Sequence, residues 1–227
     1  MGNRIVIFGI GDFAAMAAIY FERDYHYEIA GFVVESKYKN KEEFMGKKVI
    51  DFESIRYTFP PDENMAFIAV TYQCLNRERH RLFRETKDMG YEMANYVSPF
   101  SYVEKNVEIG ENVFVFENNT LQYGVRIGNN TIIWSGNHIG HSTIVGNDTY
   151  ISSHVCISGK CSIGDKCFLG VNSAIADSVV VPDDTLLAMG AAMTKTIEKR
   201  GCILAGVPAR EMKKTSYEYF GVRRDEI

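Results

Sequence analysis

One aliphatic residue recurs at every sixth position through most of the second half of this 227-residue chain. The series runs from Val97 to Leu187 without an insertion, and all sixteen members are Ile, Leu or Val. The position four after each member carries a small or β-branched residue, such as Thr131 or Cys161. An antiparallel sandwich would alternate with a period of two between irregular loops. It therefore cannot account for this unbroken period of six.

A period of six is typical of a hexapeptide β-helix. Each hexad gives one short strand and one tight turn, and three hexads close a triangular coil of eighteen residues. The aliphatic residue points inward and stacks on its equivalents one coil away, while Gly, Asn and Asp supply the turns. We expect this β-helix over residues 97–192. The first and last coils expose unpaired strand edges, so both ends of the β-helix need caps. Residues 1–96 and 193–227 are expected to supply them.

The first 96 residues have the pattern of a small α/β domain. An apolar strand at 4–8 precedes a helical run at 15–23, and further strands are expected at 28–35 and 66–71. A second helix, at 77–90, ends in glycine. This order predicts a small Rossmann-like parallel sheet.

The loop after the first strand carries the pattern Gly9-x-Gly11-x-x-Ala14. Such glycines let the main chain approach a phosphate at a helix N-terminus. Glu35 ends the second strand, where it would either hydrogen-bond a nucleotide or simply be solvated. The usual second half of a dinucleotide fold is missing, which favours a mononucleotide ligand over NAD. Arg77 opens a basic cluster at the same sheet edge, which is either a phosphate contact or a solvated helix face.

His141 is the expected proton acceptor of the β-helix. It follows an inward isoleucine by two positions, so it points outward, and His titrates near neutral pH. Gly159 lies eighteen residues later and is expected to stack on it at roughly 4.8 Å, the strand spacing. Its main-chain N–H would stabilise an oxyanion. His138 and His154 lie nearby, but their spacing does not match a three-histidine zinc site, so no metal is expected.

Charge, cysteine content and hydropathy indicate which classes of protein the chain does not resemble. The formal charge of −4 gives no reason to expect nucleic-acid binding. The five cysteines are odd in number and lack a CxxC pair, which argues against a disulfide framework. The chain opens without a signal-peptide layout and has no apolar run long enough to span a bilayer. A cytoplasmic protein without membrane partners is expected.

Together these residues resemble the bacterial nucleotide-amino-sugar N-acetyltransferases and sialic-acid O-acetyltransferases of the hexapeptide-repeat family. The resemblance covers the glycine loop, the hexads and the closing segment Ala205-Gly206-Val207-Pro208-Ala209-Arg210. It implies a left-handed β-helix, a homotrimer with active sites between subunits, acetyl-CoA as donor and a nucleotide-linked sugar as acceptor. A place in lipopolysaccharide or O-antigen biosynthesis follows from the same likeness.

The resemblance also implies roles for particular residues. His141 matches the general base and Gly159 the donor to the acetyl carbonyl, while Val171 and Gly190 match positions along the CoA arm. The substrate-binding residues implied by the likeness or by their position are, in order, Gly9, Gly11, Asp12, Phe13, Glu35, Arg77 and His138. Asp12 would have to turn away from a diphosphate or contact a sugar hydroxyl. Relatives often place a carboxylate beside the base, whereas Gly140 and Ser142 flank it here.

Three functions therefore stay open. N-acetylation of a nucleotide-linked amino sugar, with direct attack on the thioester, is the leading hypothesis. O-acetylation of a sialic acid or another sugar hydroxyl would use the same residues. A nucleotide-sugar-binding protein without catalysis is the third, because the carboxylate beside His141 is missing.

Overall fold

The computed structural model describes residues 3–227, which form two compact units. The first unit contains the chain up to residue 71 together with residues 81–96. The second contains residues 72–80 and 97–227. Helix α3 (Arg77–Asp88) therefore contributes its first four residues to the second unit and the rest to the first. Each unit has its own hydrophobic core.

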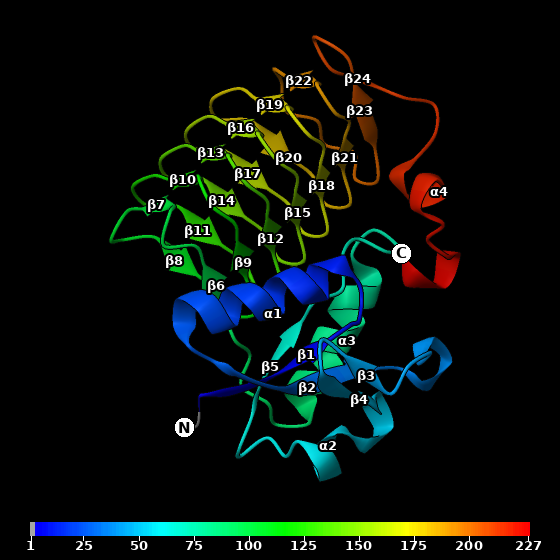
Figure 1. The fold of residues 1–227 in the computed structure, drawn as a ribbon. Helices are drawn as coiled ribbons and strands as arrows, with labels where there is room; N and C mark the ends of the chain where they lie inside the picture. The colour runs from blue at the N-terminus through cyan, green and yellow to red at the C-terminus, as the bar shows by residue number, and fades with distance from the viewer. Residues whose placement is uncertain (1–2) are drawn as a thin grey trace. The chain divides into compact units, whose positions relative to one another are not determined.

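The first unit is a five-stranded sheet in the order β3-β4-β2-β1-β5 (Figure 1). Its central strands are parallel, and only β3 runs antiparallel to its neighbour. The strands are β1 (Arg4–Phe8), β2 (Glu28–Val34), β3 (Glu43–Phe44), β4 (Lys47–Asp51) and β5 (Met65–Ile68). The expected strands at 4–8 and 28–35 form, and the one expected at 66–71 forms over Met65–Ile68 and so ends earlier than expected. β3 and β4 were not expected, because polar and charged residues surround only two apolar ones in β4.

Helices cover both faces of this sheet because alternate residues of a strand point to opposite sides. Val6 and Phe8 pack with Leu82 and Phe83 of α3. On the other face, α1 (Asp12–Tyr25) buries a stripe at helical spacing, and Phe21 meets Phe67 at 5.2 Å between ring centroids. Short helical turns complete the unit: η1 (Ser36–Tyr38), η2 (Phe52–Ser54) and α2 (Ile55–Thr58).

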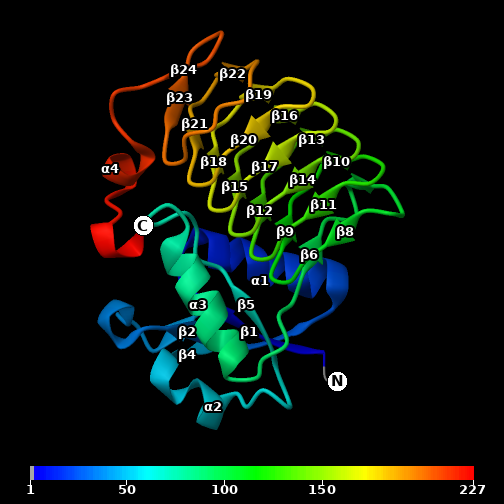
Figure 2. The ribbon, with the colours of Figure 1, turned by 180° about the vertical axis from the view of Figure 1, so that it is seen from behind.

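The second unit is the expected parallel β-helix. Its strands pair with strands eighteen residues away, as in the register His138↔Cys156 and Ile139↔Ile157. They build three flat sides, which Figures 1 and 2 show as stacked rows of short arrows. The inward aliphatic series and the small residues between form one continuous buried core. Met193 extends the series by one hexad beyond Leu187 and pairs with Ile175 of the preceding coil.

We name the sides by their strands. Side 1 contains β7 (Tyr102–Val103), β10 (Thr120–Leu121), β13 (His138–Ile139), β16 (Cys156–Ile157), β19 (Ala174–Ile175) and β22 (Ala192–Met193). Side 2 contains β8 (Glu108–Ile109), β11 (Arg126–Ile127), β14 (Ile144–Val145), β17 (Ser162–Ile163) and β20 (Val180–Val181). Side 3 contains β6 (Tyr96–Val97), β9 (Phe114–Val115), β12 (Ile132–Ile133), β15 (Tyr150–Ile151), β18 (Phe168–Leu169), β21 (Leu186–Leu187), β23 (Ile203–Ala205) and β24 (Arg210–Glu211).

The outer face of side 3 is apolar, and aromatic residues of the same unit cover it around Tyr150 and Phe168. Tyr72 lies edge-on to the rings of Tyr150 and Phe168, and Phe220 of α4 (Ser216–Phe220) packs against Phe168. A last turn, η3 (Arg224–Glu226), follows. Within residues 3–227, every helix is too short or too polar to serve as a membrane span.

Candidate active site

His141 lies at the turn that joins β13 of side 1 to β14 of side 2. Its ring rests on the main chain of Gly159, one coil later. A Cβ at position 159 would lie 2.6 Å from Nε2 of His141 and 2.8 Å from Cε1. The Lys160 N–H donates to the His141 carbonyl at 2.8 Å, which fixes the two coils together. His141 is exposed whereas Gly159 is buried beneath it. Only glycine leaves room for the imidazole in this position.

The N–H of Gly159 is open. Elsewhere in the β-helix, a side chain from the next coil accepts the equivalent N–H: Asn147 Oδ1 takes that of Asn129 at 2.9 Å, and Asp165 Oδ1 takes that of Asn147 at 2.7 Å. The N–H of His141 itself donates to Gln122 Oε1 at 2.9 Å. Among residues 3–227, the Gly159 N–H makes no hydrogen bond. A donor free beside a proton acceptor suits a developing oxyanion.

The imidazole of His141 likewise makes no hydrogen bond to any residue of the described chain. Ser142 follows it with a left-handed φ of 58°. Gly140 and Ser142 flank His141, so no carboxylate stands next to it in the chain. His138 lies on the outer face of β13, three residues earlier, and is half-buried.

Val171 and Gly190 lie at a different corner, between side 3 and side 1. They stack on each other, because the Gly190 N–H donates to the Val171 carbonyl at 2.8 Å. Val171 also borders a pocket of about 550 Å³ between side 3 and α4, whose walls include Phe168, Met189 and Phe220. The whole width of side 1 separates this corner from His141. Within one chain, His141 therefore lies beside Gly159, and Val171 lies beside Gly190. The two pairs lie at different corners and do not contact each other.

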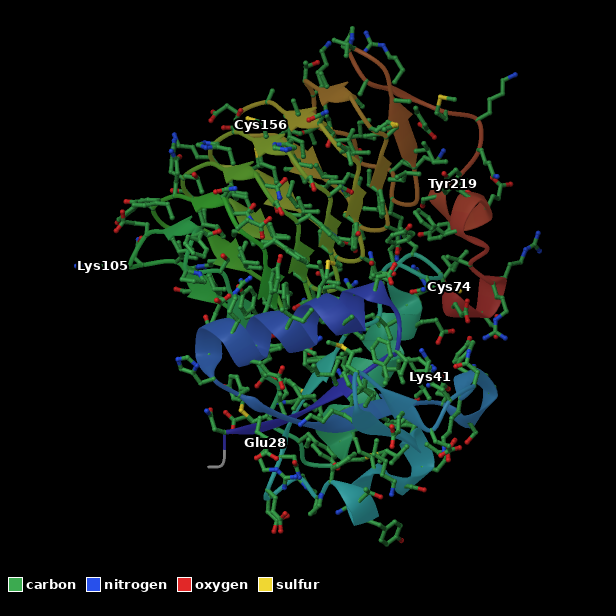
Figure 3. All side chains as sticks on the ribbon, viewed as in Figure 1. Glu28, Lys41, Cys74, Lys105, Cys156 and Tyr219 are labelled. Carbon is green, nitrogen blue, oxygen red and sulfur yellow. The ribbon has the colours of Figure 1, made fainter. Side chains whose placement is uncertain are left out.

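The outer face of side 1 between these corners carries His138, Cys156 and Ala174 on successive strands. Figure 3 labels Cys156, the exposed member of the cysteines. Burial raises the pKa of the Cys161 and Cys167 thiols, which keeps them protonated and unreactive. None of the described residues form a group of three or more His, Cys, Asp or Glu side chains that could hold a metal ion.

The predicted nucleotide loop lies in the first unit. Gly9 has a φ of 112°, and a Cβ there would come within 3.0 Å of the Ala69 carbonyl, so the position requires glycine. Gly11 is the N-cap of α1, and no side chain caps the helix. Asp12 is exposed in the first turn. The Phe13 ring points into the core against Phe67 at 6.1 Å. Only the main chain of Phe13 can therefore face a ligand.

Glu35 already has partners in its own unit. Its Oε2 accepts from Arg81 Nη2 at 2.9 Å and lies 3.5 Å from Lys37 Nζ. Arg81 also contacts Glu85. Arg81 belongs to the basic cluster that Arg77 opens, but the sequence pattern did not pair it with Glu35, since the two lie 46 residues apart.

Arg77 has a different environment from the one expected. Its guanidinium lies 2.8 Å from Asp184 Oδ1 and donates to the Glu226 carbonyl at 2.9 Å, both in the second unit. Its side chain is mostly buried. Arg77 thus fastens residues 72–80 to the coils, and its contact with substrate phosphate stays a prediction.

Sequence models of two repeat families match consecutive stretches of the coils. Bacterial transferase hexapeptide (six repeats) matches residues 124–159, and the hexapeptide repeat of succinyl-transferase matches residues 160–195. A search of curated proteins found no match.

Several solved structures share the fold over the full chain. A mutant of perosamine N-acetyltransferase from Caulobacter crescentus, in complex with CoA and GDP-perosamine, is 24% identical with a TM-score of 0.83, covering 94% of this chain and 98% of that chain. The acetyltransferase domain of PglB from Neisseria gonorrhoeae, in complex with acetyl coenzyme A, is 18% identical with a TM-score of 0.82, covering 93% and 100%. WeeI from Acinetobacter baumannii is 18% identical with a TM-score of 0.76, covering 92% and 99%.

These likenesses confirm the fold that the sequence resemblance implied. Residues 124–195 are hexapeptide-repeat sequence, and the chain as a whole has a small parallel α/β sheet followed by a left-handed parallel β-helix, the fold of the Caulobacter crescentus sugar N-acetyltransferase.

Proposed function

We propose that this protein is an acetyl-CoA-dependent N-acetyltransferase that acts on the amine of a nucleotide-linked amino sugar in bacterial glycan biosynthesis. The observation that carries the proposal is the pairing of His141 with the open N–H of Gly159. The bound ligands of similar structures support the same reaction: CoA with GDP-perosamine in one, acetyl coenzyme A in another.

The proposed reaction uses both groups of the His141 corner, the imidazole and the Gly159 N–H. The thioester carbonyl oxygen accepts the Gly159 N–H, which polarises the carbonyl and stabilises the negative charge of the tetrahedral intermediate. The sugar amine attacks the carbonyl carbon, and Nε2 of His141 accepts a proton from the attacking nitrogen. The intermediate then expels the CoA thiolate, which leaves as the thiol after taking up a proton. The products are an amide on the sugar and free CoA.

We propose that the first unit binds the nucleotide of the acceptor. The main chain around Gly9 and Gly11, at the uncapped start of α1, suits the diphosphate of the acceptor. Glu35, at the end of β2, keeps its Oε1 available for the nucleobase. His138 would contact the acceptor or donor from side 1.

We further propose a homotrimer with its active sites between subunits. The separation of His141 from Val171 and Gly190 supports this arrangement, because a second copy could place its Val171 corner against the His141 corner of the first. One CoA molecule would then contact both pairs.

The test of the activity measures release of CoA thiol with a disulfide reagent. Acetyl-CoA and a panel of nucleotide-linked amino sugars serve as substrates for the wild type and for His141→Asn. We expect wild-type turnover with at least one amino sugar, and a loss of at least ~10² in kcat for the variant, as is typical of a removed general base. A hydroxyl-only analogue of the active acceptor should give no release.

A matched variant guards against loss of fold. His26→Asn alters another exposed histidine, which follows α1 in the first unit, and should keep near-normal turnover. Near-normal turnover of His141→Asn would remove the residue from its role. Release with the hydroxyl analogue alone would replace N-acetylation by O-acetylation.

A further inference from the structure

An exposed aromatic residue stands directly before His141 in the same column of the β-helix. Tyr123 lies one coil earlier, and the Ser142 N–H donates to its carbonyl at 2.8 Å, which fixes the stacking of the two turns. Its side chain is 68% exposed. The equivalent residues of the other coils are Lys105, His141, Gly159, Asp177 and Lys195, so the column has no other aromatic member.

The coils before and after His141 differ in the size of the side chains that they expose. Toward the C-terminal coils, the outer face of side 1 carries only the small side chains of Ala174 and Ala192 beyond Cys156. Lys160 and Lys195 are exposed in the turns at the same end of side 1 and suit a phosphate-bearing donor. The His141 ring also leans this way, onto Gly159. The thioester donor therefore fits on the C-terminal side.

The N-terminal side of His141 is occupied by large rings instead. Tyr102 on β7 is 60% exposed, and its hydroxyl donates to Glu104. This bond ties Tyr102 to its own coil, whereas the Tyr123 ring makes no hydrogen bond or ring contact within residues 3–227. An acceptor whose amine reaches the carbonyl opposite the leaving thiol would approach over Tyr123.

We infer that Tyr123 is a positioning residue for the acceptor, and that its ring packs against the apolar face of the sugar. This inference rests on the proposed acetyl transfer. A pyranose ring presents a face of C–H groups, which gains dispersion contacts against a flat aromatic surface. Tyrosine supplies that surface with little loss of side-chain entropy, because it has only two χ angles. The tyrosine ring sets the height of the sugar, and therefore of its amine, relative to Nε2 of His141.

The experiment compares Tyr123→Ala, Tyr123→Phe and the wild type in steady-state kinetics with both substrates varied. We expect Tyr123→Ala to raise KM for the amino-sugar nucleotide roughly three- to tenfold, the range for a lost aromatic contact. KM for acetyl-CoA should stay unchanged, and Tyr123→Phe should restore acceptor binding. Tyr57→Ala is the matched control, because Tyr57 is a 91% exposed tyrosine on α2 of the first unit.

Light scattering on the same samples separates this role from a contact between copies of the chain. If Tyr123→Ala changes the oligomeric state, or raises both KM values together, the ring packs against another subunit and the inference is wrong. An unchanged acceptor KM in an active enzyme would overturn the inference alone. A wild type inactive with every amino-sugar nucleotide would overturn the proposed function, and the inference with it.

Discussion

Gly159→Ala adds one methyl group at the point where the His141 ring rests. The new Cβ would lie 2.6 Å from Nε2, whereas ordinary contact begins near 3.4 Å. The ring must therefore retreat by about 0.8 Å, and a misplacement near 1 Å can cost ~10² in rate. The three atoms nearest to this Cβ all belong to the exposed imidazole, and Gly159 does not have a positive φ. We expect kcat to fall about 10²-fold while the free energy of unfolding changes by less than ~1 kcal/mol.

The assay combines CoA release with urea unfolding followed by fluorescence. Gly170→Ala supplies the contrast, because its Cβ would lie 2.6 Å from the main-chain N of Met189 and 2.9 Å from two further main-chain atoms. That variant should lose stability, since main-chain atoms cannot rotate away. The pair thus separates a displaced base from a strained coil.

A double-mutant cycle then tests the cause of the lost rate. If the methyl group acts by displacing the ring, Gly159→Ala should cost nothing further in a His141→Ala background. A full second loss in that background would refute the reasoning, because the methyl group would then act on the open N–H or on the donor directly. An unchanged kcat in the single variant would refute it as well.

Three further predictions concern stability, measured as the free energy of unfolding. Ile151→Ala, at a fully buried position of the inward series, should cost about 2–5 kcal/mol in urea unfolding. Arg79→Met should cost about 1–3 kcal/mol, because the buried guanidinium donates to the Asn130 carbonyl at 3.0 Å, and a control at exposed Arg126 should cost less. Burial opposes ionisation of Asp148, but the His80 hydrogen bond and charge, with Asn130 and Arg79, lower its pKa overall. Because the pKa is lower in the folded state, ionised Asp148 stabilises the fold at pH values above its unfolded pKa of about 3.9, and this stabilisation is lost as the pH falls below that value. Asp148→Asn should therefore flatten the acid limb of a curve of unfolding free energy against pH.

The sequence predicted the β-helix well because its signal is repeated once per hexad. Each inward residue stacks on the inward residues eighteen positions before and after it. A wrong assignment of one hexad would therefore have conflicted with the hexads around it. The stacking of His141 on Gly159 followed from the same arithmetic. The open N–H of Gly159 could not be predicted, because it depends on where the side chain of each neighbouring turn points. In other turns Asn or Asp folds back to accept the equivalent N–H.

The contacts of residues 72–80 lay beyond the sequence pattern. Arg77 and Arg79 belong to a run of alternating charges, which is typical of a solvated helix face. In the structure Arg79 is fully buried, and Arg77 pairs with Asp184, which is itself 1% exposed. The partner of Arg79 is the Asn130 carbonyl. Asn130 and Asp184 both lie at the corner between sides 2 and 3, more than 50 residues from the arginines in sequence. No local periodicity encodes such a long-range ion pair, because it requires knowledge of which surface the segment covers.

The period of eighteen residues per coil also decides which of the predicted CoA-site residues can lie at the same corner of the β-helix. Residues share a corner only when their numbers differ by a multiple of eighteen, within the two or three positions of one turn. His141 and Gly159 satisfy this condition, as do Val171 and Gly190, but no such multiple links one pair to the other. The hydrogen bonds agree, joining Lys160 to His141 and Gly190 to Val171. A CoA molecule that contacts all four residues must therefore either cross the face of side 1, over His138 and Cys156, or lie between two copies of the chain. Since crossing places Cys156 beneath the ligand, alkylation of Cys156 that is not slowed by CoA would exclude that path and leave the two-copy site.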